Sequence, residues 1–188
     1  LSGPEVDLII NVLDASNLER NLYLTTQILE LKRPVIFVLN MMDDAERQGV
    51  RVDLKILGKL LGGPVIPTVG NREEGIDLLK RTILSVHHGR DDRVRQVPVS
   101  YGEDIEGELS KLMVEIQRDE DLATPRWLAL QLLERTKDSE FLVAQSHART
   151  AIQAQQKASL SFLESHLGAD GSTLLAERRY GFAHGLVK

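Results

Sequence analysis

The sequence predicts a parallel α/β unit in its first half and a small all-helical domain in its second half. Apolar, strand-like runs alternate with amphipathic helical segments up to residue 89, which is the pattern of a parallel sheet joined by helical crossovers. A charged stretch without periodicity follows at residues 90–97, as expected of a linker. Beyond it the apolar residues recur only at helical spacing. We therefore expect two domains, at residues 1–89 and 98–188.

Three runs in the first half have the apolar character of strands that are buried on both faces of a parallel sheet. They are residues 6–14, 35–40 and 64–69. Helices are expected to begin at Ser16, Asp53 and Ile76. Ser16 and Glu19 have the spacing of a capping box. The repeated order of strand and helix predicts a parallel unit built from right-handed crossovers.

Helical periodicity in the second half predicts a small bundle. Its first helix carries one apolar stripe, formed by Ile105, Leu109, Leu112 and Ile116. Thr124 and Pro125 are expected to be the N-cap and the first residue of a second helix, because a proline there lacks only an N–H that would be unpaired anyway. A longer helix is expected over residues 140–166, and a last one begins near Ser172.

The composition argues against several functional classes. The 188 residues carry 28 acidic and 23 basic side chains, a net charge of -5 and 4% aromatic residues, so neither a basic face nor aromatic-basic interleaving indicates nucleic-acid binding. The chain has no cysteine, which excludes disulfides and thiolate chemistry within it. No apolar run reaches the ~18 residues that a membrane-spanning helix needs. Because the sequence begins at Leu1 in the middle of an apparent domain, we expect a fragment of a longer protein.

Asn40 and Asp43 follow the second predicted strand, at the end of the strand where open α/β sheets bind ligands. An ionised Asp accepts hydrogen bonds through two oxygens, so Asp43 suits the neighbouring N1–H and N2–H donors of guanine. Adenine has an acceptor at N1 and no 2-amino group, and leaving a buried group unpaired costs about 1–3 kcal/mol, more for a charged one. The pair therefore predicts guanine recognition, and the alternative for N-x-x-D is a turn or a helix cap.

A second polar loop, Val69-Gly70-Asn71, follows the third predicted strand. Its backbone N–H groups are expected beside Asp43, on the side where a guanine O6 would lie, because neighbouring parallel strands end at the same sheet edge. The glycine permits close backbone approach there. The alternative is an ordinary turn between a strand and a helix.

Other candidate sites have less support. The five histidines lack metal-cluster spacing; they are His87, His88, His147, His166 and His184. The acidic run at residues 43–46 is better explained as the first turn of a helix, where carboxylates interact favourably with the helix dipole. No G-x-x-x-x-G-K-[S/T] motif occurs in the sequence, so it holds no phosphate-cradling loop of that kind and no Ser/Thr of such a loop for Mg²⁺.

Three stretches together resemble the cytoplasmic GTPase region of the FeoB family of bacterial ferrous iron transporters. They are residues 14–25 (D-A-S-N-L-E-R-N-L-Y-L-T), 39–43 (L-N-M-M-D) and 63–67 (G-P-V-I-P). The resemblance implies that residues 6–89 are the C-terminal half of a Ras-like P-loop GTPase domain. It also implies that residues 98–188 are the helical, GDI-like regulatory domain that follows.

Residue by residue, the resemblance implies that Asn40 and Asp43 belong to the fourth GTPase motif. Asp43 then reads guanine N1 and N2, the Asn40 amide binds O6 or N7 or braces the phosphate loop, and Met41 lies between them. The fifth motif, whose backbone contacts the base, falls on Val69, Gly70 and Asn71. Relatives often carry serine where this chain has Gly70. No catalytic residue and no metal ligand is assigned in the chain.

The resemblance further implies GTP or GDP as the ligand, with Mg²⁺ held only together with a phosphate-loop half expected before Leu1. The whole protein would be a GTPase coupled to Fe²⁺ uptake, with a membrane permease portion as partner, at the cytoplasmic face of the bacterial inner membrane. The strand at residues 6–14 would pair with the missing phosphate-loop strand. Its bare edge is therefore expected to need that portion, another chain or a homo-oligomer.

Two other functions remain open from the residues. One is a non-catalytic helical interaction or oligomerisation module on an α/β scaffold. The other is a fragment of a translation or ribosome-assembly GTPase, which the acidic balance disfavours.

Overall fold

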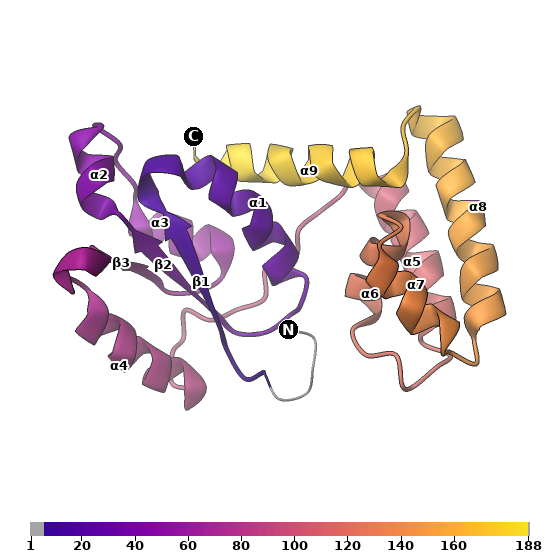
Figure 1. Cartoon of the computed structure of the whole chain (residues 1–188), viewed down its shortest axis with the longest axis horizontal. Coiled ribbons are helices and arrows are strands. Elements are labelled where there is room, and N and C mark those ends of the chain that lie inside the picture. The colour runs from indigo at the N-terminus through magenta and orange to yellow at the C-terminus, as the bar shows by residue number, and fades with distance from the viewer. Residues whose placement is uncertain (1–5, 188) are drawn as a thin grey trace. The chain divides into compact units, whose positions relative to one another are not determined.

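A parallel sheet of three strands is the centre of the first half of the chain (Figure 1). The strands are β1 (Ile9–Asp14), β2 (Val35–Asn40) and β3 (Val65–Pro67), hydrogen-bonded in that order. The computed structural model describes residues 6–187, and its sheet confirms the predicted α/β class. Asp14 and Asn40 are register partners at the strand ends, so both residues lie at the carboxyl edge of the sheet.

The described residues fall into two units. One unit comprises residues 6–99 together with 181–187, and the other comprises residues 100–180. The first contains the sheet and the helices that flank it, whereas the second is built from helices alone.

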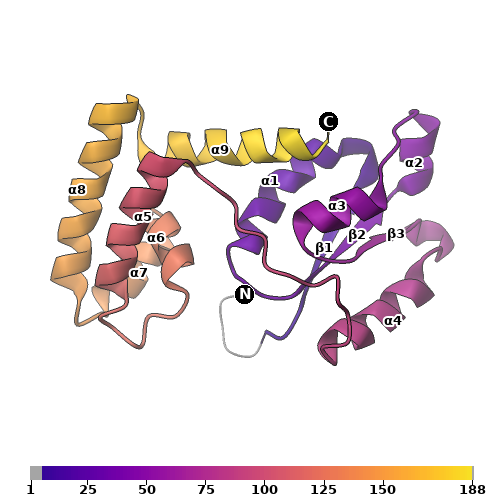
Figure 2. The ribbon, with the colours of Figure 1, turned by 180° about the vertical axis from the view of Figure 1, so that it is seen from behind.

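Helices cover both faces of the sheet in the first unit (Figures 1 and 2). The helical segments of this unit before residue 90 are η1 (Ala15–Asn17), α1 (Leu18–Leu29), α2 (Met42–Arg47), α3 (Leu54–Leu61), η2 (Gly70–Arg72) and α4 (Ile76–His87). On the α4 face, Ile36, Val38 and Ile66 pack against Val86. On the α1 face, the buried Asn11 amide donates to Thr25 Oγ1 at 2.7 Å, which satisfies a polar group that would otherwise be unpaired in the core.

The strand ends differ from those predicted. β1 begins three residues later than expected, at Ile9, whose N–H donates to the Pro34 carbonyl at 2.9 Å. β3 ends at Pro67 because Val69 leaves the ladder and forms an antiparallel bridge with Glu74. That bridge closes the loop after β3 onto itself.

The predicted capping box at the start of the first helix is wrong. Asp14 Oδ1 accepts from the Ser16 N–H at 2.8 Å and from the Ser16 hydroxyl at 2.7 Å. The Ser16 hydroxyl is therefore a donor to the strand end and does not cap the helix. A short Asp side chain can bond the backbone two residues ahead, so the chain makes the η1 turn before α1 begins at Leu18.

β1 exposes apolar side chains. Ile10 and Val12 are 43% and 59% exposed, whereas the alternate residues Ile9 and Leu13 are buried. Among residues 6–187, β1 pairs only with β2, which leaves its other backbone edge without a strand. An edge of this kind is a template for pairing with a further strand.

The second unit contains the helices α5 (Glu103–Ile116), α6 (Pro125–Leu133), α7 (Lys137–Ala144), α8 (Arg149–Leu167) and most of α9 (Gly171–Leu186). The predicted stripe on α5 is buried. Pro125 is the first residue of α6 as expected, but Thr124 has φ 54° and makes no side-chain cap. The left-handed backbone of Thr124 gives its side chain a different direction from that of a normal N-cap residue.

The single helix expected over residues 140–166 is wrong, because the chain breaks between α7 and α8. Ser146 causes the break: its hydroxyl donates to the buried carboxylate of Asp119, and it accepts from the Ala148 N–H at 3.0 Å. These bonds compete with helical backbone bonds, as Ser side chains commonly do.

Candidate functional site

The six residues predicted to recognise guanine line one cavity of about 280 Å³. They are Asn40, Met41, Asp43, Val69, Gly70 and Asn71. Two loops bring them together, one after β2 and one after β3. Asp44 and Arg47 also line the cavity, and the sequence had not singled them out as site residues.

Asn40 joins the two loops. Its side-chain oxygen accepts from the Gly70 N–H at 3.0 Å and from the Thr68 hydroxyl at 3.1 Å. Since both bonds use the carbonyl oxygen, the NH₂ group is the part of Asn40 suited to a ligand acceptor. Thr68 was missed from sequence because a threonine at a strand end gives no signal of its own.

Met41 sets the direction of the chain after β2. It has φ 61°, in the left-handed region that non-glycine residues rarely adopt, and the next residue, Met42, donates its N–H to the Thr68 carbonyl at 3.3 Å. This turn ends the strand and starts α2 at once, which puts Asp43 in the first turn of the helix. The Met41 side chain is 40% exposed at the cavity.

Asp43 forms an ion pair with a residue that the sequence did not predict. Its Oδ2 lies 3.2 Å from Nη2 of Arg72, with the two side chains 22% and 58% exposed. Arg72 Nη1 also lies 4.0 Å from Glu74 Oε1. Arg47 and Asp44, which both line the cavity, pair with each other. In the sequence these charges form an ordinary polar run, so only the folded chain identifies the pairing.

Gly70 approaches Asn40 without needing a glycine backbone. A Cβ built on it would lie 3.4 Å from Asn40 Oδ1, an ordinary contact, and its φ is not in the left-handed region. A small side chain therefore fits at this position. The close approach expected of Gly70 is made by its N–H group.

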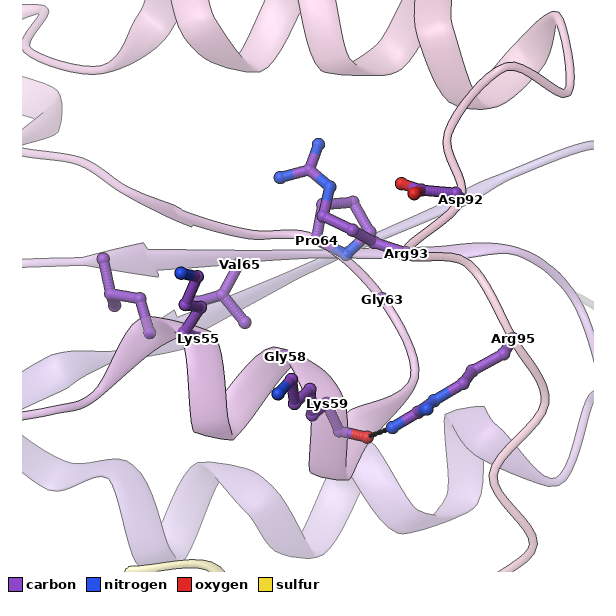
Figure 3. Close-up of a pocket in the computed structure, with 10 residues that line it drawn as sticks. Lys55, Gly58, Lys59, Gly63, Pro64, Val65, Asp92, Arg93 and Arg95 are labelled. Carbon is purple, nitrogen blue, oxygen red and sulfur yellow. Dashed lines mark hydrogen bonds between the residues drawn. The ribbon is translucent and has the colours of Figure 1, made fainter.

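A second cavity, of about 460 Å³, lies beside α3 and holds none of the predicted residues (Figure 3). It is lined by Leu54, Lys55, Gly58, Lys59, Gly63, Pro64, Val65, Asp92, Arg93 and Arg95. Arg95 donates to the Lys59 carbonyl, and Arg93 binds both oxygens of Asp91 at 2.8 and 2.6 Å. The Arg93 hydrogen bond holds the pKa of the Asp91 carboxyl below its usual value, although burial acts in the opposite direction. Arg95 thus links the segment of residues 91–95 to α3, and Arg93 binds Asp91 within that segment.

Two further features bear on function. Among residues 6–187, no cluster of three His, Cys, Asp or Glu side chains is arranged to hold a metal ion. Within the same residues, no helix combines the length and apolar character needed to cross a bilayer.

The parallel strand order and the two loops at the carboxyl edge are typical of a ligand-binding α/β domain, which a helical domain follows in this chain. Residues 1–83 match the family model for ferrous iron transport protein B, and residues 101–188 match the model for the FeoB cytosolic helical domain. The chain belongs to the FeoB family. This finding overturns the alternative of a translation or ribosome-assembly GTPase.

Individual relatives and a solved structure support the same family. The chain is 35% identical, over 97% of its length, to an Fe(2+) transport protein A/Fe(2+) transporter FeoB fusion protein of Porphyromonas gingivalis, and spans 22% of that protein. It is 48% identical over 71% of its length to Fe(2+) transporter FeoB of Salmonella typhimurium, and spans 17% of it. A crystal structure of a mutant S. thermophilus NFeoB bound to GDP matches with a TM-score of 0.86 and 26% identity, covering 99% of this chain and 70% of that one.

Proposed function

We propose that this chain supplies the guanine-recognition half of a GTP/GDP site and the helical regulatory domain of a ferrous iron transporter. The proposal depends on one observation: Asn40, Asp43 and the loop of residues 69–71 line the same cavity. The GDP bound to the S. thermophilus NFeoB relative supports the same ligand. In the whole protein, GTP hydrolysis is coupled to Fe²⁺ uptake at the cytoplasmic face of the bacterial inner membrane.

Each site residue has a distinct role in this proposal. Asp43 accepts from guanine N1–H and N2–H through its two carboxylate oxygens. The Asn40 NH₂ group donates to the base, while its oxygen holds the loop through Gly70. Backbone N–H groups of that loop donate to O6, and the Met41 side chain covers part of the ring face.

The proposed division of labour follows the predicted domains. Residues 1–89 recognise the base, residues 90–97 link the domains, and residues 98–188 regulate nucleotide binding and lead to the permease portion. Phosphate binding and Mg²⁺ belong to other elements of the parent protein, because this sequence has no phosphate-binding loop of the G-x-x-x-x-G-K-[S/T] kind. A homo-oligomer is compatible with the open edge of β1.

Exchange of the Asp43 carboxylate for an amide tests the proposal. In the cytosolic region of the parent protein, Asp43→Asn should weaken GDP binding about ten- to a hundredfold, because one oxygen acceptor becomes a donor facing donors. It should strengthen binding of xanthosine diphosphate, whose 2-oxo group accepts from that new donor. Fluorescent nucleotide titration measures both affinities.

Asp44→Asn is the matched control, since Asp44 lies next in the chain and pairs with Arg47. It should leave the preference for guanine intact. Equal GDP affinity in the Asp43→Asn and Asp44→Asn variants would contradict guanine reading by Asp43, and absence of guanine-nucleotide binding would favour the interaction-module function.

A further inference from the structure

We propose that Arg72 competes with the guanine base for the Asp43 carboxylate and thereby speeds nucleotide release. The inference rests on the proposed guanine site and concerns its regulation. It assigns Arg72, in the loop after β3, a role in nucleotide exchange and not in catalysis.

The geometry places Arg72 in the loop that is expected to contact the base. Arg72 ends η2, and its N–H donates to the Val69 carbonyl at 3.0 Å, so its backbone is part of the loop fold. Its guanidinium reaches across to Asp43, with Nη2 at 3.2 Å from Oδ2. The ion pair therefore links the loop after β3 to the start of α2.

The chemistry of guanine recognition creates the competition. Asp43 needs one oxygen for N1–H and the other for N2–H of the base. Arg72 already uses Oδ2, so a base that binds both oxygens must displace the guanidinium or share that oxygen with it. Displacement is the outcome proposed here: the bound state then lacks the Arg72–Asp43 ion pair, so the bound base is less stable than it would be beside a free carboxylate.

Glu74 offers the displaced guanidinium a second carboxylate. Arg72 Nη1 is 4.0 Å from Glu74 Oε1, and Glu74 is fixed near Val69 by two backbone hydrogen bonds of 3.2 and 3.3 Å. The guanidinium thus reaches both carboxylates at once, through Nη2 and Nη1. In this proposal, Arg72 keeps its pair with Glu74 when the base takes the Asp43 carboxylate.

Arg47, which lines the same cavity as Asp43, provides a comparison of equal charge. It pairs with the carboxylate of Asp44, and its Nε donates to the backbone carbonyl of Asp43 at 3.3 Å. Arg47 does not use the Asp43 carboxylate in any of these contacts. Removing either arginine deletes one positive charge near the ligand, but only Arg72 competes with the base.

The test measures fluorescent GDP binding and release in the cytosolic region of the parent protein. Arg72→Gln should tighten GDP binding and slow its release by about two- to fivefold, the range expected from an exposed ion pair. Glu74→Gln should weaken GDP binding, because Arg72 then stays on Asp43. Arg47→Gln should not tighten binding, since Arg47 pairs with Asp44 and leaves the Asp43 carboxylate free for the base. Salt should reduce all these differences.

A double-mutant cycle tests whether Arg72 acts on nucleotide binding through the Asp43 carboxylate. In the Asp43→Asn background, Arg72→Gln should no longer change nucleotide affinity, because the contested carboxylate is gone. If Arg72→Gln weakens GDP binding, or matches Arg47→Gln, the competition is refuted while guanine reading by Asp43 stands. If GDP does not bind, or binds independently of Asp43, the proposed function itself fails and the competition fails with it.

Discussion

At the scale of single residues, two glycines in the loop after β3 differ in whether the backbone requires a glycine. Gly75 has φ 82°, and a Cβ there would lie 2.2 Å from the Pro67 carbonyl oxygen. Gly70 has an ordinary φ and room for a Cβ beside Asn40. Both residues look alike in the sequence, but only Gly75 is required by the backbone.

Alanine at each position should therefore have opposite effects on the free energy of unfolding. Gly70→Ala should stabilise the cytosolic region of the parent protein by about 0.4–1 kcal/mol, because it restricts the unfolded chain without strain. Gly75→Ala should destabilise it by at least about 1–2 kcal/mol. Urea denaturation measures both, and destabilisation by Gly70→Ala would show that the loop needs a glycine there.

At the scale of elements, a buried ion pair ties α9 to the residue that follows α6. The Arg179 side chain is 1% exposed, pairs with Glu134 and donates to the Tyr101 hydroxyl at 3.3 Å. Burial lowers the pKa of Arg179, but the hydrogen bond to Glu134 contributes to a net rise above its usual value. The guanidinium is thus a charged part of the helical core, and it is the ion-pair partner of Glu134.

Removing one partner of this pair should be costly. Arg179→Met should destabilise the helical unit by about 3–5 kcal/mol, because it leaves the Glu134 carboxylate without its main counter-charge. Arg178→Met, at the exposed neighbouring position, should change stability by less than about 0.5 kcal/mol. Thermal unfolding followed by circular dichroism compares them. If the double variant Arg179→Met with Glu134→Leu is no more stable than Arg179→Met alone, the loss does not come from an unpaired charge.

At the scale of the whole molecule, the decisive feature is the edge of β1 with which no strand of residues 6–187 pairs. Val12 is 59% exposed on this strand, and the NFeoB structure that the chain matches is longer than the chain, which covers 70% of it. We infer that a further strand of the parent protein pairs with β1. The 188 residues taken alone are then expected to associate, and not to form a stable nucleotide-binding monomer.

A charge on the β1 edge should reduce that association. Val12→Lys should shift the 188-residue chain toward smaller species in analytical ultracentrifugation, because lysine on an edge strand opposes strand pairing. Leu84→Lys is the matched control, since Leu84 is 58% exposed on α4. Equal effects of the two changes would mean that general apolar exposure, and not the β1 edge, drives association. A sharply melting monomer of the unmodified chain that binds GDP at micromolar concentration would contradict the expectation altogether.

Apart from Met41, which only the family resemblance added, the sequence by itself predicted the parallel α/β class, the helical second half and the residues around the candidate site. These features depend on local patterns: buried strands read as continuous apolar runs, and polar residues just beyond them mark the ligand edge. The helical break at Ser146 was not predictable in this way, because its cause is a hydrogen bond to Asp119, 27 residues earlier in the chain.

Tertiary structure alone decided which charges meet. Arg72 lies 29 residues after Asp43 in the sequence, yet their side chains pair because β2 and β3 end side by side. The same holds for Arg179 and Glu134, which lie 45 residues apart. Periodicity and propensity describe neighbours within a few residues, whereas ion pairs across loops depend on strand order and helix packing. The sequence therefore predicted residues suited to guanine, and the fold revealed the arginine that pairs with one of them.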